Sequence, residues 1–99
     1  MAEIVLKSNK PTKASVVLKE VLDIETLRVK HSLKLAKKRL EAFERRYNIS
    51  SETFLDEWSA EDLHDGDMEY VEWAGEYQLA SKLNERLDTI QSIEYVVAS

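Results

Sequence analysis

The longest regular pattern in the chain runs from Val29 to Tyr47, where apolar residues recur at steps of four, three, four, three and four. These steps keep the apolar residues on one face of an α-helix, as a narrow stripe of the coiled-coil kind. No Gly or Pro interrupts the stretch, and Asn48 follows it, a residue that tolerates the left-handed conformation in which helices end. The pattern predicts a long helix ending near Tyr47. The stripe residues are Val29, Leu33, Ala36, Leu40, Phe43 and Tyr47.

A second apolar pattern, in residues 13–27, precedes this stripe, and Thr12 is placed to cap it. Its apolar residues do not continue the stripe, and the offset falls near Glu25 and Thr26. Residues 13–47 therefore form either one helix with a bend or two helices. Before them, residues 1–12 predict an N-terminal arm or a short strand around Ile4, which either stays mobile or pairs with its copy in a dimer.

Two further helices are predicted in the second half. Ser50 or Ser51 can cap a short helix over residues 51–62, and Asp67 can cap a long one over residues 68–95. Trp73 and Tyr77 are the largest apolar groups of the last helix and should anchor it against the first. The expected fold is all-α, with a long, a short and a second long helix packed antiparallel in a single domain of residues 13–99.

Composition narrows the function classes. The chain has 99 residues, no cysteine, two Gly and one Pro. Disulfides and thiolate metal sites are excluded, an all-β domain is disfavoured, and a cytoplasmic location is expected. No apolar run approaches the roughly 18 residues of a membrane span, and the N-terminus lacks the pattern of a signal peptide.

Charge is divided unevenly along the chain. Residues 1–47 carry twelve Lys/Arg and six Asp/Glu, whereas residues 48–99 carry two and thirteen. Such asymmetry indicates two surfaces for two kinds of partner, or two halves that neutralise each other within the fold.

Residues that carry chemistry are sparse. His31 and His64 lie far apart and have no HExxH-type spacing, so zinc or nucleophilic catalysis lacks partners. The acidic loop around Asp65 and Asp67 fails the calcium-loop pattern, because Gly66 directly follows Asp65 instead of occupying the sixth position. We expect no enzyme activity, no cofactor and no metal.

The basic residues of the first long helix can contact nucleic-acid phosphates, although a solvated helix face is the ordinary explanation of such a run. Stacking of single-stranded bases is disfavoured, because Phe43 and Tyr47 belong to the apolar stripe. The predicted nucleic-acid-binding residues are Lys37, Lys38, Arg39, Arg45 and Arg46.

Residues 40–77 carry a recognisable motif. Phe43 opens the run FERRYNISSE, Phe54 follows, and an acidic loop leads to the run YVEW that ends at Trp73. This arrangement resembles the TumA-like antitoxins of type II toxin–antitoxin pairs, over about two fifths of the chain. Two positions depart from the family pattern, with Asn48 in place of Gly and Thr53 in place of a Glu that would complete a capping box.

The resemblance implies a protein that binds and neutralises a ribonuclease-type toxin, with repression of its own operon through DNA as a second role. An acidic surface would complement a basic toxin. Because the stripe from Val29 to Tyr47 is long for the core of one chain, we expect a homodimer or a fold that depends on a partner. Two alternatives remain: a DNA-binding regulator, with the arm and a helix over residues 12–23 arranged as in ribbon-helix-helix dimers, or a helical scaffold. The predicted partner-binding residues are Asp65, Asp67, Glu69, Glu72 and Glu76.

Overall fold

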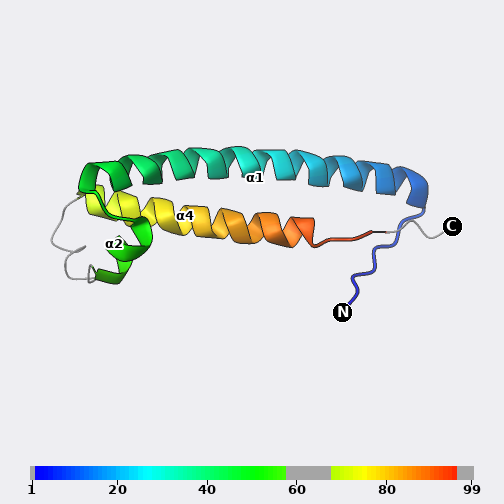
Figure 1. Cartoon of the computed structure of the whole chain (residues 1–99). Helices are drawn as coiled ribbons and strands as arrows, with labels where there is room; N and C mark the ends of the chain where they lie inside the picture. Colours follow the sequence, from blue (N-terminus) through cyan, green and yellow to red (C-terminus); the bar gives the residue numbers. More distant parts are fainter. Residues whose placement is uncertain (1, 58–67, 96–99) are drawn as a thin grey trace.

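The structure is a computed structural model that describes residues 2–57 and 68–95, and every regular element in these ranges is an α-helix (Figure 1). Helix α1 spans Pro11–Tyr47, α2 spans Ser51–Glu57 and α4 spans Met68–Gln91. Helix α4 runs back along α1, and α2 lies at the end where α1 stops (Figure 1). The all-α fold with antiparallel long helices is confirmed.

Helix α1 is continuous over 37 residues, so residues 13–47 belong to one helix and the alternative of two helices is wrong. Thr26 fits within it because its hydroxyl bonds back to the Leu22 carbonyl at 2.7 Å. The helix begins at Pro11, whose missing N–H needs no partner in a first turn. The predicted cap at Thr12 is therefore wrong: Lys10 takes the cap position, without a side-chain hydrogen bond.

The turn between α1 and α2 follows the sequence prediction closely. Asn48 adopts the left-handed conformation, at φ 53° and ψ 47°, and ends α1. The Ser50 hydroxyl then accepts a hydrogen bond from the Thr53 N–H at 3.1 Å, which caps the first turn of α2.

The outer limits of the other elements differ from those predicted. Helix α4 ends at Gln91, and residues 93–95 continue without helical structure. Residues 2–7 form no strand within the described part of the chain. The predicted continuation of the short helix to residue 62, including Trp58, and the Asp67 cap lie outside the described residues.

The core is a single thin layer between α1 and α4, closed at one end by α2. On α1 it contains four residues of the predicted stripe, and the stripe residues Phe43 and Tyr47 pack against it half-buried. Trp73 is fully buried, as expected of an anchor. The buried apolar residues are Val29, Leu33, Ala36, Leu40, Phe54, Trp73, Ala80 and Leu83.

The two long helices differ in length. With 37 and 24 residues, α1 and α4 extend about 55 and about 36 Å at 1.5 Å per residue. The molecule measures 59 × 24 × 20 Å, and its radius of gyration of 19.3 Å exceeds the roughly 13 Å of a compact chain of this size. Its surface of 8107 Å² likewise exceeds the roughly 5,800 Å² of a compact monomer.

Candidate interaction surfaces

The end of the molecule where all three helices meet is built on stacked aromatic rings. The rings of Phe54 and Trp73 are nearly parallel, with centroids 4.0 Å apart. Phe43 and Tyr47 of α1 each stack on Trp73 with centroids at 5.5 Å. We call this group, with Tyr70, the aromatic elbow. It fixes α2 against both long helices, since each helix contributes at least one ring.

A buried polar chain crosses the aromatic elbow. The Trp73 indole N–H donates to Ser51 Oγ at 2.8 Å, and the backbone N–H and hydroxyl of Ser51 both donate to Glu44 Oε2 at 2.8 Å. The indole donor is thereby satisfied in the core, where an unpaired N–H would destabilise the fold. The motif that carries the family resemblance thus supplies helix ends, a buried polar chain and core aromatic rings.

Two of the predicted partner-binding carboxylates are engaged within the fold. Glu69 accepts a hydrogen bond from the Tyr47 hydroxyl at 2.7 Å and forms an ion pair with Arg46 at 2.6 Å. Glu76 pairs with Arg39 at 3.2 Å. The Glu69 hydrogen bond, aided by burial and by the negative charge, raises the pKa of Tyr47 to about 12.

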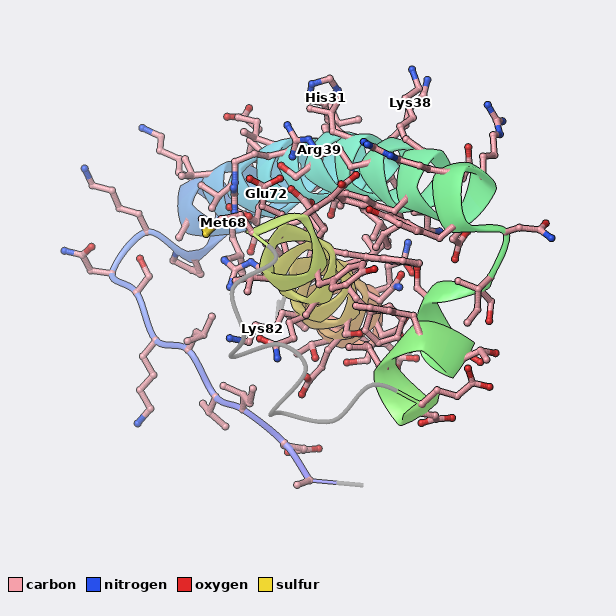
Figure 2. All side chains as sticks on the ribbon, turned by 90° about the vertical axis from the view of Figure 1, so that its left-hand side faces the viewer. His31, Lys38, Arg39, Met68, Glu72 and Lys82 are labelled. Carbon is pink, nitrogen blue, oxygen red and sulfur yellow. The ribbon has the colours of Figure 1, made fainter. Side chains whose placement is uncertain are left out.

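The two sets of predicted binding residues therefore meet along one edge of the helix pair. Glu69, Glu72 and Glu76 share this edge of α4, since they are spaced three and four residues apart. Glu72 is exposed and lines a surface hollow with Arg39 (Figure 2). The two halves neutralise each other here in part, as one sequence alternative proposed.

The remaining predicted residues divide into two groups. Asp65 and Asp67 lie outside the described residues. Lys37, Lys38 and Arg45 are exposed on α1 and form no ion pair with any residue in ranges 2–57 and 68–95. Lys38 points away from α4 (Figure 2). A basic surface thus remains on α1 after the contacts with α4 are made.

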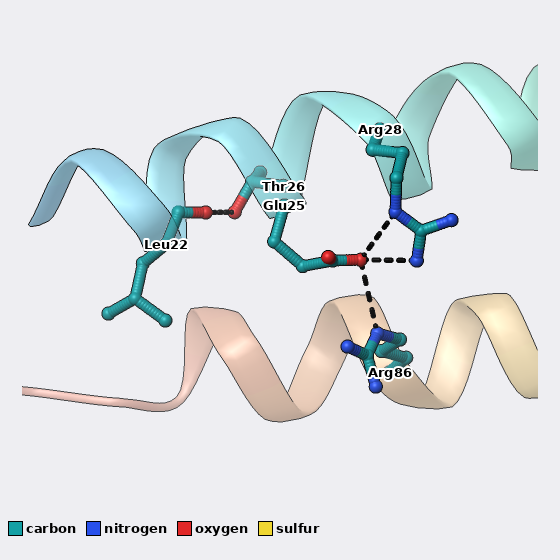
Figure 3. A network of polar contacts seen from close by, with 5 residues as sticks. All are labelled: Leu22, Glu25, Thr26, Arg28 and Arg86. Carbon is teal, nitrogen blue, oxygen red and sulfur yellow. Dashed lines mark hydrogen bonds and ion pairs between the residues drawn. The ribbon is translucent and has the colours of Figure 1, made fainter. Parts of the chain in front are cut away.

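Towards the other end of α4, a third link joins the long helices, with the charges reversed. Arg28 Nε donates to Glu25 Oε1 at 2.9 Å, and Arg86 of α4 reaches the same oxygen at 3.3 Å (Figure 3). Hydrogen bonding from Arg28, with a smaller contribution from Arg86, lowers the pKa of Glu25. This contact fixes the alignment of the helices at a second point.

A further acidic surface lies on α2. Glu52, Asp56 and Glu57 are exposed there, and none of them enters an ion pair with another described residue. They begin a stretch, residues 52–72, that holds nine Asp/Glu and no Lys/Arg. The sequence prediction did not include these three residues, because it placed the acidic surface in the loop around Asp65 and Asp67 and on the last helix. The absence of Lys/Arg from residues 52–72 could have indicated that the acidic surface includes α2.

The described residues show neither a metal site nor a membrane-spanning helix. They contain no group of three His, Cys, Asp or Glu side chains placed to hold a metal ion. Among the helices described, none combines the length and the apolar character that crossing a bilayer requires.

Comparison of the chain with protein-family models, with curated protein sequences and with solved structures finds no match. The antitoxin resemblance therefore stays a hypothesis that rests on the motif residues.

Proposed function

We propose that this protein is an antitoxin-like interaction protein that binds and neutralises a basic, ribonuclease-type toxin. The proposal places the contact on residues 52–72, here called the acidic segment. The observation that carries it is the density of charge: this segment holds nine carboxylates and no Lys/Arg, and an aromatic anchor lies near each of its ends. The anchors are Phe54 and Trp73, which stack on each other in the core.

The physical argument concerns both the rate and the cost of binding. Clustered carboxylates attract a basic protein over a distance and raise the association rate, most strongly at low salt. The aromatic elbow holds α2 in place before a partner arrives, so Glu52, Asp56 and Glu57 lose little backbone freedom on binding. A surface that covers the RNA-binding groove of a toxin would block its substrate by the same charge complementarity.

The test is co-expression with the product of the neighbouring gene, followed by pull-down and growth rescue. We expect the native chain to recover a small basic protein and to restore growth. The triple variant Glu52→Gln, Asp56→Asn and Glu57→Gln should lose most of both effects. The matched control is Asp23→Asn, Glu41→Gln and Glu85→Gln, which removes three exposed carboxylates elsewhere. Equal behaviour of the two triple variants would contradict the proposal.

A second candidate function, operator DNA binding, is favoured by the basic residues of α1 that form no ion pair within ranges 2–57 and 68–95. Lys37, Lys38 and Arg45 form no ion pair with the described residues and can contact phosphates, whereas Arg39 and Arg46 already pair with carboxylates. A gel shift on the upstream DNA tests this function. We expect the variant with Gln at Lys37, Lys38 and Arg45 to lose binding. Loss of the native shift at moderate salt on every sequence would indicate non-specific phosphate contacts.

A further inference from the structure

The middle of α1 carries a strongly basic stretch. Residues 26–40 hold six Lys/Arg and no Asp/Glu. Two of the six, Arg28 and Arg39, pair with Glu25 and Glu76. The other four are exposed and form no ion pair with any residue of ranges 2–57 and 68–95. We call these four residues the lysine face: Lys30, Lys34, Lys37 and Lys38.

The lysine face occupies one side of the helix. The spacing of its members, four, three and one residues, places them within an arc of about 100° and along about 12 Å of α1. All four line one surface hollow, together with Leu33 and Glu41. Figure 2 shows Lys38 on the side of α1 away from α4, whereas Arg39 lies beside Glu72. The lysine face is therefore separate from the edge where the charges of the two long helices pair.

We infer that the lysine face binds the phosphate backbone of a nucleic-acid duplex, without regard to base sequence. The inference rests on the second candidate function and narrows it, and it adds Lys30 and Lys34 to the contact. A duplex carries about seven negative charges over the 12 Å or so that the four lysines span, so each ammonium group can meet a phosphate.

The chemistry of the hollow fits a nucleic acid better than a protein or a bilayer. Leu33, which lines the hollow, is only 6% exposed, so little apolar area is left to bury between the lysines. The exposed Ile24 and Leu27 of α1 do not line it. Protein interfaces have an apolar core and are depleted of Lys, and a helix on a bilayer inserts an apolar side. Interfaces with nucleic acid are instead polar and strongly positive.

The same residues indicate that phosphates are contacted and bases are not. Base edges are read chiefly by bidentate pairs from Arg, Asn and Gln, whereas the ammonium of Lys is a point charge. The neighbouring Arg28 and Arg39 are already paired with carboxylates. No aromatic ring is among the described residues that line the hollow, which disfavours stacking of single-stranded bases. A duplex contacted through its phosphates remains.

Fluorescence anisotropy with the full chain and labelled duplexes tests the inference. The probes are DNA duplexes of about 20 base pairs, one with the upstream operator sequence and one with its bases scrambled, at about 50–200 mM salt. We expect affinities equal within about twofold and a slope of log affinity against log salt of about −4, at about −0.9 per phosphate. An RNA duplex of the scrambled sequence is the third probe, and the tighter of RNA and DNA identifies the source of the phosphates.

A variant of the lysine face places the contact. Removing its four charges should lower the affinity for both DNA duplexes by about tenfold or more, while Gln preserves the helix. The matched control removes four exposed lysines elsewhere and should keep most of the affinity. The first variant is Lys30→Gln, Lys34→Gln, Lys37→Gln and Lys38→Gln. The control is Lys10→Gln, Lys13→Gln, Lys19→Gln and Lys82→Gln.

A third variant should strengthen binding. Glu41→Gln removes the carboxylate from the hollow and should raise the affinity about two- to fivefold. Its control, Glu85→Gln, makes the same charge change at an exposed residue of α4 that does not line the hollow, and should leave the affinity unchanged. A gain in affinity does not arise from unfolding, so this pair of variants tests the contact independently of stability.

Three results would contradict the inference in different ways. Equal loss in the two quadruple variants would overturn the placement on the lysine face. Binding to the operator more than about tenfold tighter than to the scrambled duplex would overturn sequence independence and leave operator binding standing. Absence of binding to every duplex at about 50 mM salt would overturn both this inference and the second candidate function. The toxin proposal is separate, because the lysine variant retains the acidic segment and should still recover the toxin-like partner.

Discussion

The indole N–H of Trp73 donates to Ser51 Oγ over 2.8 Å, and this contact joins α4 to the first turn of α2 inside the core. Ser51 is itself 3% exposed, and its hydroxyl donates a hydrogen bond to Glu44 of α1. One hydroxyl thus links three helices. The position of α2, which carries three exposed carboxylates, depends on this hydroxyl.

Replacing Ser51 by Ala should destabilise the protein by about 1–3 kcal/mol, because it leaves the buried Trp73 N–H without an acceptor. Urea unfolding followed by Trp fluorescence measures the loss. Thr53→Ala is the control on the same helix, since Thr53 is exposed, and it should change stability by no more than about 0.5 kcal/mol. Equal effects of the two substitutions would show that the buried hydroxyl has no special role.

Phe54→Ala should cost about 3–5 kcal/mol, because it removes the ring that stacks on Trp73 and opens a cavity in the aromatic elbow. Helix α2 has no other fully buried apolar residue among those described. Limited proteolysis should then cut near α2 well before it cuts the middle of α1. Simultaneous loss of both regions would instead mean that the molecule unfolds as one unit.

Because Asn48 has a left-handed backbone conformation, we expect Ala and Gly at this position to change stability in opposite directions. Asn48→Ala should destabilise by about 1 kcal/mol, because a Cβ without a side-chain hydrogen bond disfavours φ 53°. Asn48→Gly should match or exceed the native stability, since Gly adopts this conformation freely. Thermal unfolding of the three proteins ranks them, and a rank with Ala above Gly would contradict the conformational argument.

Tyr47 predicts a loss of stability at alkaline pH. Its pKa rises from 10.0 to about 12 in the folded state, chiefly through the hydrogen bond to Glu69. The raised pKa means that the contribution is complete below pH 10 and is lost as pH increases towards 12. Ultraviolet titration should show one late-ionising tyrosine that is missing in Tyr47→Phe. Tyr47→Phe should also lose less stability than the native protein across this range.

The local parts of the fold were predictable because their causes are local. The stripe through Leu33 and Leu40 follows from helical periodicity, and the break at Asn48 and Ser50 follows from conformational and capping preferences. The offset residues Val17 and Ile24 were harder to interpret. They suggested a bend or a break into two helices, but they are exposed residues of one continuous helix.

The candidate site was less predictable, because it depends on how two distant helices are aligned. Arg39 and Glu76 are 37 residues apart, and nothing local in the sequence shows that they meet. They pair because the packing of Trp73 in the core and the contact between Glu25 and Arg86 fix how α4 is aligned along α1. The sequence indicated both the basic residues of the first helix and the acidic residues of the last. It did not show that they meet along one edge of the helix pair.

The difference in length between α1 and α4 has a consequence for backbone motion. Amide protons around Leu33 and Leu40 exchange with solvent only when the helix pair separates. Those near Lys13 are held by a single helix turn with no neighbour from α4, so unwinding of that turn alone exposes them. One uninterrupted helix therefore contains two regions with very different amide exchange rates, and their boundary lies where α4 ends.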